Sequence, residues 1–264
     1  AISSFSAGTS GMDGLLTIRP DGVVYIHQGV GNLGTGSTFD TARAAMEALQ
    51  TGWEQAEVIW GDTSKHLPWS SIQAGSMTTH AHTRANYAAG LDAKRKLQEI
   101  AARDLGGSQD DYDVADGRVF RLGNRLQGMS FVRAAERAIA LGGKYDGHEL
   151  PEDINGQTTT SATALAGLGL MGVAKDNFET GGRNMSYAIG FAEVEVDTET
   201  GQVKLTKIVA IHDCGLIINR LATESQINGG VIGGIGYALL EDRIMDDQTG
   251  RSLNSNLIDY KVPG

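Results

Sequence analysis

The feature that most constrains this chain is a pair of loops, rich in glycine and hydroxyl side chains, that each lie directly before a helical pattern. The first loop, HQGVGNLGTGST at residues 27–38, follows the apolar run VVYI, and the second, SSIQAGSMTTHAHT at residues 70–83, leads into an Ala-rich stretch. Glycine lets a backbone approach a ligand closely, and the N-terminus of a helix favours negative charge. Together the loops predict a site for one extended ligand that carries several phosphates and polar ring edges.

The binding residues expected in each loop are the glycines and their hydroxyl neighbours, which form an anion-binding nest at a helix start. They are, in the first loop, Gly34, Thr35, Gly36, Ser37 and Thr38, and in the second, Gly75, Ser76, Met77, Thr78 and Thr79. Gln226 in ESQINGGVIGGIG is a third candidate because its amide both donates and accepts hydrogen bonds. It lies beside Gly229, Gly230, Gly233 and Gly234. The alternatives are a tight glycine corner, a helix cap from Thr38 or Asp40, and a methionine that only fills a core gap.

A second interpretation of the first loop is a dinucleotide fingerprint, because Gly29, Gly31 and Gly34 satisfy G-x-G-x-x-G after a strand. That fingerprint requires a helix to begin within it, so that the helix N-terminus meets the pyrophosphate. Here further loop residues precede the helical pattern, and the preceding strand is the second arm of a hairpin. An acid at the end of the next strand, Asp62, keeps a nicotinamide or flavin cofactor open as the alternative.

Charge disfavours two classes of partner. The formal net charge is −10 and the isoelectric point is about 5.0, whereas nucleic acids and anionic membranes are bound mainly through clustered Lys and Arg. No apolar run approaches the roughly 20 residues of a membrane span, and the first residues lack the pattern of a signal peptide. We therefore expect a cytoplasmic protein, or a periplasmic one if it is exported as a complex, that begins as a processed or split chain.

Metal-ligating side chains are sparse. The single cysteine, Cys214, can form neither an internal disulfide nor an iron–sulfur site, and we expect it to be a small buried group at a strand end. The six histidines lack zinc-site spacing, and His80 and His82 are expected to be polar filler or supporting donors on the capping loop. Any electron relay must therefore lie on another chain.

The order of patterns predicts an α+β fold with hairpins and packed helices throughout. Residues 143–183 lack periodicity and predict a long irregular segment that wraps a neighbouring chain. The chain is expected to form one cofactor-binding region, 1–264, with two possible parts at 1–142 and 143–264. The expected elements are a hairpin at 15–29, a helix at 38–50, a strand at 56–62, a polar loop at 63–79, a helix at 81–105, a hairpin at 112–122, a helix at 130–143, a long hairpin at 187–213, a glycine-studded helix at 222–242 and a last hairpin around 247–250 that leads to a strand at DYKVP.

In this order, the stretches at 20–42, 75–89, 190–242 and 259–264 resemble the second molybdenum-cofactor-binding half of the large subunit of the xanthine dehydrogenase and aldehyde oxidase family. The most specific part is the run from Asp213-Cys214-Gly215 through Asn219 to Gln226. The resemblance implies a molybdenum–molybdopterin cofactor, in bacteria commonly the cytosine dinucleotide form. It also implies that the first loop cradles phosphates, that the second contacts pterin or phosphates, and that Gln226 lies near the cofactor.

Departures from the family pattern shape the expected function. Thr35 replaces a glutamine of the xanthine dehydrogenases and Arg220 replaces a proline, which separates the chain from the purine-oxidising branch. The family's catalytic glutamate follows a glycine beyond the DYKVP segment, and no Gly-Glu dipeptide occurs here. We expect a molybdenum-dependent oxidoreductase that hydroxylates an aldehyde or an N-heterocycle with water as the oxygen source, active only with other chains that supply the base, iron–sulfur clusters and possibly FAD. A cofactor-free scaffold subunit is the non-enzymatic alternative.

Overall fold

The computed structural model describes residues 1–7, 11–179 and 185–263, and it confirms the α+β class. The chain divides into two compact units, one of residues Ala7–Asn184 and one of Ala1–Ser6 with Met185–Gly264. The expected boundary at 142 therefore falls inside the first unit. No helix within the described ranges combines the length and the apolar character that a bilayer crossing requires.

The unit of residues 7–184 is built on a four-stranded sheet in the order β4-β3-β2-β8. The predicted hairpin is confirmed as the antiparallel pair β2 and β3, and its turn is held by the Asp21 carboxylate, which accepts from Val23 N at 2.9 Å. β3 and β4 pair in parallel, and β8 pairs antiparallel with β2 at the other edge. The strands are β2 (Asp13–Ile18), β3 (Val24–His27), β4 (Ala56–Ile59) and β8 (Leu170–Lys175).

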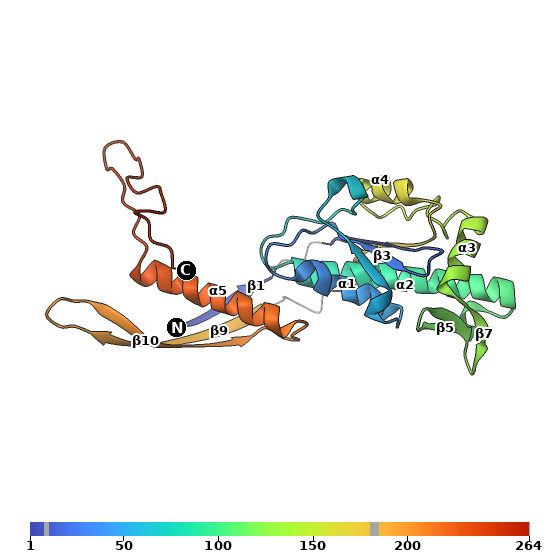
Figure 1. The fold of residues 1–264 in the computed structure, drawn as a ribbon, viewed down its shortest axis with the longest axis horizontal. Helices are drawn as coiled ribbons and strands as arrows, with labels where there is room; N and C mark the ends of the chain where they lie inside the picture. The colour runs from blue at the N-terminus through green and yellow to red at the C-terminus, as the bar shows by residue number, and fades with distance from the viewer. Residues whose placement is uncertain (8–10, 180–184, 264) are drawn as a thin grey trace. The chain divides into compact units, whose positions relative to one another are not determined.

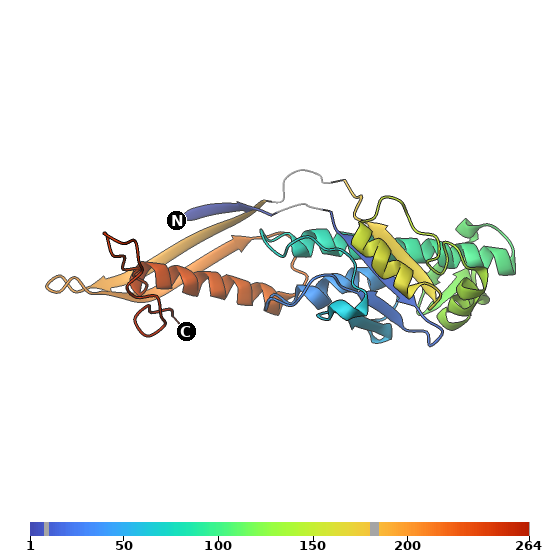
Figure 2. The same ribbon diagram turned by 90° about the horizontal axis from the view of Figure 1, so that it is seen from above.

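Helices cover both faces of this sheet (Figures 1 and 2). The predicted helices α1 (Ser37–Ala48) and α2 (Thr78–Leu105) pack on the face that carries Leu16 and Ile26. α4 (Gly156–Leu165) packs on the face that carries Leu15 and Val173. The alternation of β2 side chains between the two faces is what places a separate apolar cluster on each side.

A small three-stranded sheet and a helix complete this unit; the predicted hairpin and helix are confirmed, and the third strand was not predicted. β5 and β6 form the expected Asp-Gly hairpin, with Asp116 and Gly117 both at positive φ, and β7 leads into α3. The Ser130 hydroxyl caps α3 by accepting from Arg133 N at 3.4 Å. The elements are β5 (Tyr112–Ala115), β6 (Arg118–Arg121), β7 (Asn124–Ser130) and α3 (Phe131–Leu141), with short 3₁₀ turns at Trp53–Gln55, Thr63–Lys65 and Gln109–Asp111.

The prediction of a long irregular segment at 143–183 is wrong where a helix and a strand form, at 156–165 and 170–175, and residues 180–183 lie outside the described ranges. The segment contains α4, whose start is fixed by the Asn155 side chain accepting from Gln157 N at 2.9 Å, and the strand β8. β8 is held by its pairing with β2, more than 140 residues earlier in the chain. The segment thus belongs to the fold of this unit.

The other unit is a three-stranded antiparallel sheet in the order β1-β9-β10, with α5 alongside it (Figures 1 and 2). Its long hairpin is confirmed, and the Asp197 carboxylate organises the turn by accepting from Glu199 N and Thr200 N. The elements are β1 (Ile2–Ser6), β9 (Met185–Val196), β10 (Val203–Asp213) and α5 (Arg220–Leu239).

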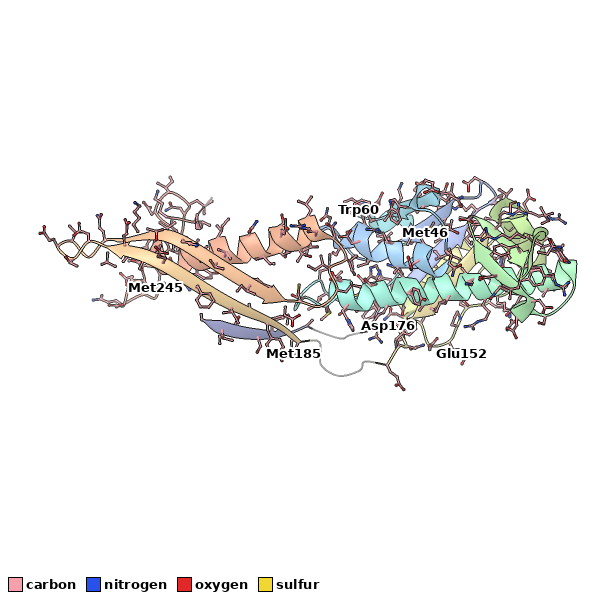
Figure 3. The ribbon with its side chains drawn as sticks, turned by 90° about the horizontal axis from the view of Figure 1, so that it is seen from below. Met46, Trp60, Glu152, Asp176, Met185 and Met245 are labelled. Carbon is pink, nitrogen blue, oxygen red and sulfur yellow. The ribbon has the colours of Figure 1, made fainter. Side chains whose placement is uncertain are left out.

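The last hairpin of this unit is reduced to a single bridge between Met245 and Ser252, and the expected DYKVP strand is not formed in the described residues. Large apolar side chains of the unit are exposed; Met185 at the start of β9 and Met245 beyond α5 are two of them (Figure 3). In the described part of α5, only Gly236 is buried. This unit therefore leaves much of its apolar surface uncovered by its own chain.

Candidate functional site

Helices α1 and α2 run parallel, so their N-termini lie at the same end of the unit. Near the starts of both helices, Thr41 Oγ1 lies 3.3 Å from His82 Nδ1. Farther along both, a Cβ atom built on Gly90 would lie 2.7 Å from the Ala48 Cβ, so the helices are packed closely there. The two candidate loops, which precede these helices, therefore converge although some 40 residues separate them in sequence.

The loops are also tied to each other by side chains that contact backbone. The Gln73 amide makes two hydrogen bonds to Gly31, accepting from its N–H at 2.8 Å and donating to its carbonyl at 2.9 Å. The Ser70 hydroxyl donates to the Gly29 carbonyl at 2.8 Å. We call these contacts, between Gln73 and Gly31 and between Ser70 and Gly29, the loop clamp.

The loop clamp does not fit the interpretation of the first loop as a dinucleotide-binding fingerprint. A Cβ on Gly29 would overlap the Pro68 carbonyl oxygen, and both backbone groups of Gly31 are held by Gln73. Helix α1 begins at Ser37, beyond the three fingerprint glycines. Two of those glycines therefore serve close packing between loops, and the helix start falls outside the pattern.

The first loop presents backbone and hydroxyl groups at the start of α1. Gly34 and Gly36 have φ values of 81° and 72°, and no atom lies within 4 Å of a Cβ built on Gly34. The hydroxyls of Thr35 and Ser37 lie 2.8 Å apart. Ser37 is itself buried, and the Thr38 side chain is fully buried with a hydroxyl that has no partner among the described residues. Thr38 thus points into the protein, and Gly36, not Thr38 or Asp40, is the N-cap residue of α1.

The second loop likewise places positive-φ residues and hydroxyl side chains at the start of α2. Gly75 and Ser76 are both at positive φ, with values of 62° and 54°, and both are exposed. Thr78 and Thr79 form the first turn of the helix. Met77 is its N-cap residue and packs against an apolar cluster that contains Met12 and Val30. The core-filling alternative therefore holds for the Met77 side chain.

Side-chain capping distinguishes these two helices from the others. Of the five α-helices in the described ranges, α3, α4 and α5 are capped by the side chains of their N-cap residues Ser130, Asn155 and Asn219, whereas the N-cap residues of α1 and α2 make no such bond. At the start of α1, Thr35 Oγ1 accepts from Ser37 N over a long 3.5 Å. The first N–H groups of a helix require hydrogen-bond partners from side chains, water or a ligand. The two uncapped helix starts lie beside each other, which concentrates donors and positive dipole ends at one place.

A buried polar layer lies between α1 and α2 beneath the loops. The Asn86 amide donates to Gln28 Oε1 at 3.3 Å and to the Thr41 carbonyl at 3.1 Å. The Thr41 hydroxyl donates its single proton to the Ser37 carbonyl at 2.8 Å, so it accepts from the Nδ1–H of His82. Complete burial lowers the pKa of His82 to about 4, so its imidazole is neutral at pH 7.

This polar layer was not predicted: His82 was expected to be polar filler or a supporting donor, and neither Gln28 nor Asn86 was a candidate. The available signal was the i, i+4 spacing of His82 and Asn86 on a face of α2 that otherwise buries alanines. Nearby, His27 at the end of β3 is also buried; desolvation first, and then the positive charge of Arg19, lower its pKa to about 4.

The remaining candidates, Gln226 and Cys214, lie in the other unit. Gln226 is exposed on α5, and its glycine neighbours have open space where a Cβ would lie. Cys214 is exposed, so the expectation that it is buried is wrong, because it follows the end of β10 in an uncovered turn. The described residues contain no group of three or more His, Cys, Asp or Glu side chains placed to hold a metal ion.

Comparisons with known proteins identify the family. The model of the molybdopterin cofactor-binding domain matches residues 1–264. The chain is 27% identical over 246 residues to the aldehyde oxidoreductase molybdenum-binding subunit PaoC of Escherichia coli O157:H7, covering 93% of this chain and 29% of that protein. It is 29% identical over 253 residues to the nicotine 6-hydroxylase large subunit of Paenarthrobacter nicotinovorans, covering 94% and 28%. The chain therefore spans less than a third of these relatives.

Solved structures share the fold at lower identity. Quinoline 2-oxidoreductase from Pseudomonas putida 86 matches with a TM-score of 0.71 and 22% identity, over 100% of this chain and 32% of that one. CO dehydrogenase from Oligotropha carboxidovorans matches with a TM-score of 0.73 and 21% identity, over the same shares. With the family model matched along its whole length, this chain belongs to the molybdopterin cofactor-binding domain family, as its resemblance to the xanthine dehydrogenases and aldehyde oxidases implied.

Proposed function

We propose that this chain forms one wall of the molybdopterin site of a molybdenum hydroxylase, and that the cofactor phosphates and pterin bind across the starts of α1 and α2. The observation that carries this proposal is the pair of parallel helices that lack side-chain caps and are joined by the loop clamp. One anionic ligand with several hydrogen-bonding groups can satisfy both helix starts at once.

The residues fit such a ligand. Gly34 and Gly75 are open on the side where other residues carry a Cβ, so a phosphate or ring edge can approach the backbone there. Half-buried Thr35 and exposed Ser76 add hydroxyl groups at the two loops, and the buried Ser37 hydroxyl lies 2.8 Å from that of Thr35. When bound, the cofactor supplies the redox chemistry of its metal, and this chain binds and orients it.

The roles proposed for the other candidates differ in kind. Thr38 and Met77 shape the loops from beneath, Thr38 through a buried side chain and Met77 through a partly buried one, and their backbone N–H groups belong to the helix starts. Thr78 and Thr79 offer amides and hydroxyls in the first turn of α2. Gln226 is proposed to contact the cofactor from α5, where its amide is exposed.

The remainder of the enzyme is proposed to lie on other polypeptides. The exposed apolar side chains of β9, β10 and α5, among them Phe191, Ile211 and Tyr237, support a large contact with another chain. That chain would supply the catalytic glutamate, and further partners would carry iron–sulfur clusters and possibly FAD. The relatives' names favour an aldehyde or an N-heterocycle as the substrate. The proposed cofactor is the cytosine dinucleotide form, and the proposed compartment is the cytoplasm, or the periplasm for an exported complex.

Elemental analysis of the purified complex tests this function, together with the nucleotide that acid treatment releases. A Thr35→Val variant loses a hydroxyl at the loop and is expected to lower molybdenum content severalfold, because a hydrogen bond to a charged group contributes about 1.5–3 kcal/mol. Thr160→Val is the matched control, since Thr160 is exposed on α4 and its hydroxyl bonds only to the Gly156 carbonyl. A complex without molybdenum or nucleotide would support the scaffold alternative, and equal molybdenum content in both variants would remove Thr35 from the site.

A further inference from the structure

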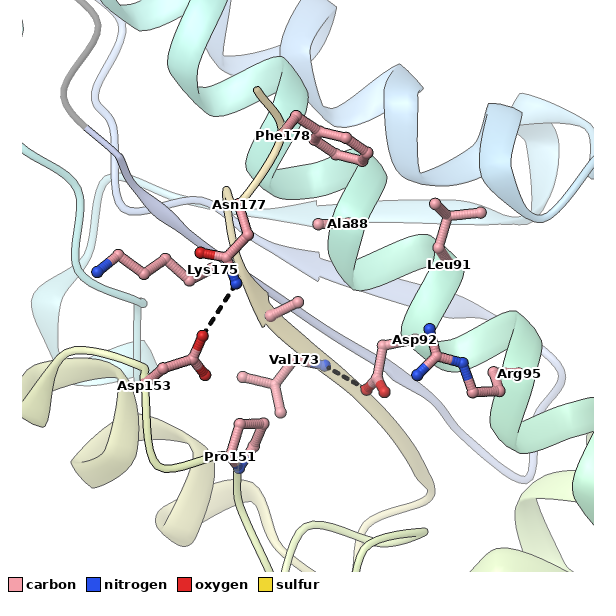
Figure 4. A pocket seen from close by; sticks show the side chains of 11 residues that line it. Ala88, Leu91, Asp92, Arg95, Pro151, Asp153, Val173, Lys175, Asn177 and Phe178 are labelled. Atoms are coloured by element: carbon pink, nitrogen blue, oxygen red, sulfur yellow. Dashed lines mark hydrogen bonds between the residues drawn. The ribbon is translucent and has the colours of Figure 1, made fainter. Parts of the chain in front are cut away.

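A groove of about 320 Å³ lies along the outer edge of β8, away from the candidate cofactor loops. Figure 4 shows Leu91, Asp92 and Arg95 of α2 on one side, Pro151 and Asp153 on the other, and β8 between them. The groove is thus the gap between the helical layers on the two faces of the sheet, with an edge strand as its floor.

The first half of this strand edge is closed by other groups. Met171 N donates to the Tyr145 carbonyl at 2.9 Å, and the Met171 carbonyl accepts from Lys96 Nζ at 2.8 Å. Val173 N donates to Asp92 Oδ2 at 3.1 Å. These contacts show that residues 171 and 173 direct their backbone groups away from β2.

The second half of the edge is open. Backbone groups alternate in direction along an antiparallel strand, so the Val173 carbonyl and both backbone groups of Lys175 face the same edge as Val173 N. None of these three groups has a hydrogen-bond partner on that edge within the described ranges of the chain. An edge with open donors and acceptors is a template for another strand.

The side chains around the open edge carry an excess of unpaired positive charge. Arg95 and Lys175 line the groove and form no ion pair or hydrogen bond with the described residues. Of the two carboxylates in the groove, Asp92 is paired with Lys96 at 2.6 Å, and Asp153 accepts from the neutral Asn177 amide at 2.9 Å, so one unpaired negative charge stands against the two cations. Leu91, Pro151 and Phe178 add apolar contact surface.

We propose that an extended polypeptide segment, with an acidic side chain among apolar ones, binds in this groove and adds a strand to β8 at residues 173–175. The open backbone groups of Val173 and Lys175 can pair with an extended main chain. The unpaired cations Arg95 and Lys175 favour an acidic side chain in the bound segment. We assign the segment to the partner polypeptide that completes the molybdopterin site, because this chain spans only 29% of a relative such as PaoC. This assignment of the source rests on the proposed function, which places the chain in a larger assembly.

Carbodiimide cross-linking of the purified complex tests the proposal, because it joins a lysine to a carboxylate only where the two touch. The expected result is a bond from Lys175 to an Asp or Glu outside residues 1–264, together with slow amide hydrogen exchange at Lys175. Arg95→Glu is expected to lower the yield of that cross-link about five- to tenfold by charge repulsion. Arg103→Glu is the matched control, since Arg103 is an exposed cation of α2 outside the groove.

The proposal is overturned if Lys175 cross-links only within residues 1–264 or not at all, or if its amide exchanges as fast as an exposed loop amide. It is equally overturned if both Arg variants give the wild-type yield. Molybdenum content is measured on the same samples. A complex that lacks molybdenum but retains the Lys175 cross-link contradicts the proposed function and leaves strand addition at β8 supported.

Discussion

Replacing Gln73 by leucine removes both Gln73–Gly31 hydrogen bonds of the loop clamp while keeping a side chain of similar size. Two hydrogen bonds to Gly31, of 2.8 and 2.9 Å, are lost, and both Gly31 backbone groups are left facing an apolar side chain. At about 0.5–1.5 kcal/mol for each bond, the closed arrangement of the loops loses about 1–3 kcal/mol. That loss corresponds to a roughly 5- to 150-fold rise in the open population.

Hydrogen exchange of residues 29–36 and molybdenum content in the purified complex measure the effect. Faster exchange in this loop and a lower molybdenum content are expected together, because the loop clamp aligns both helix starts for one ligand. Gln127→Leu is the control: it removes one long hydrogen bond, 3.5 Å to the Leu105 carbonyl, in the small sheet of the same unit. If Gln73→Leu matches this control in exchange and in molybdenum content, the loop clamp does not organise the site.

Two further predictions concern the stability of residues 7–184. His27 and His82 each have a pKa of about 4 in the folded chain. Below about pH 6.5 the unfolded chain therefore binds more protons than the folded chain. The free energy of unfolding falls by about 3 kcal/mol per histidine as the pH drops to 4. Urea unfolding followed by tryptophan fluorescence measures this free energy, since all three tryptophans lie in this unit. Equal free energies of unfolding at pH 7 and pH 4.5 would contradict the prediction. Gly90→Ala should destabilise the unit by about 1–3 kcal/mol, because its Cβ would lie 2.8 Å from the Ala45 carbonyl oxygen. Thermal unfolding compares it with Gly156→Ala, where a Cβ meets open space, and equal melting temperatures would show that α1 and α2 adjust without cost.

Features set by short stretches of sequence could be predicted. The turns at Asp21-Gly22 and Asp116-Gly117 depend on local hydrogen bonding and positive φ, and both hairpins formed as expected. The amphipathic pattern of α3 and its Ser130 cap are likewise local. The two candidate loops were identified for the same reason, since glycines and hydroxyls before a helix are visible in sequence.

Features set by distant partners could not be predicted. The short run of β8 becomes a strand only beside β2, and α4 has a Thr-rich sequence with a weak apolar face. The inward direction of Thr38 depends on the packing of α1 against α2. The exposure of Cys214 likewise follows from what its unit leaves uncovered. No local pattern distinguishes these cases from their alternatives.

The most direct test of the central claim is a crystal structure of the purified complex, with anomalous scattering recorded at the molybdenum absorption edge. The account predicts a cofactor whose phosphates accept hydrogen bonds from backbone N–H groups at the starts of both α1 and α2, within residues 34–38 and 75–79. A molybdenum site whose cofactor contacts neither loop, or contacts only one while water fills the other helix start, would contradict it.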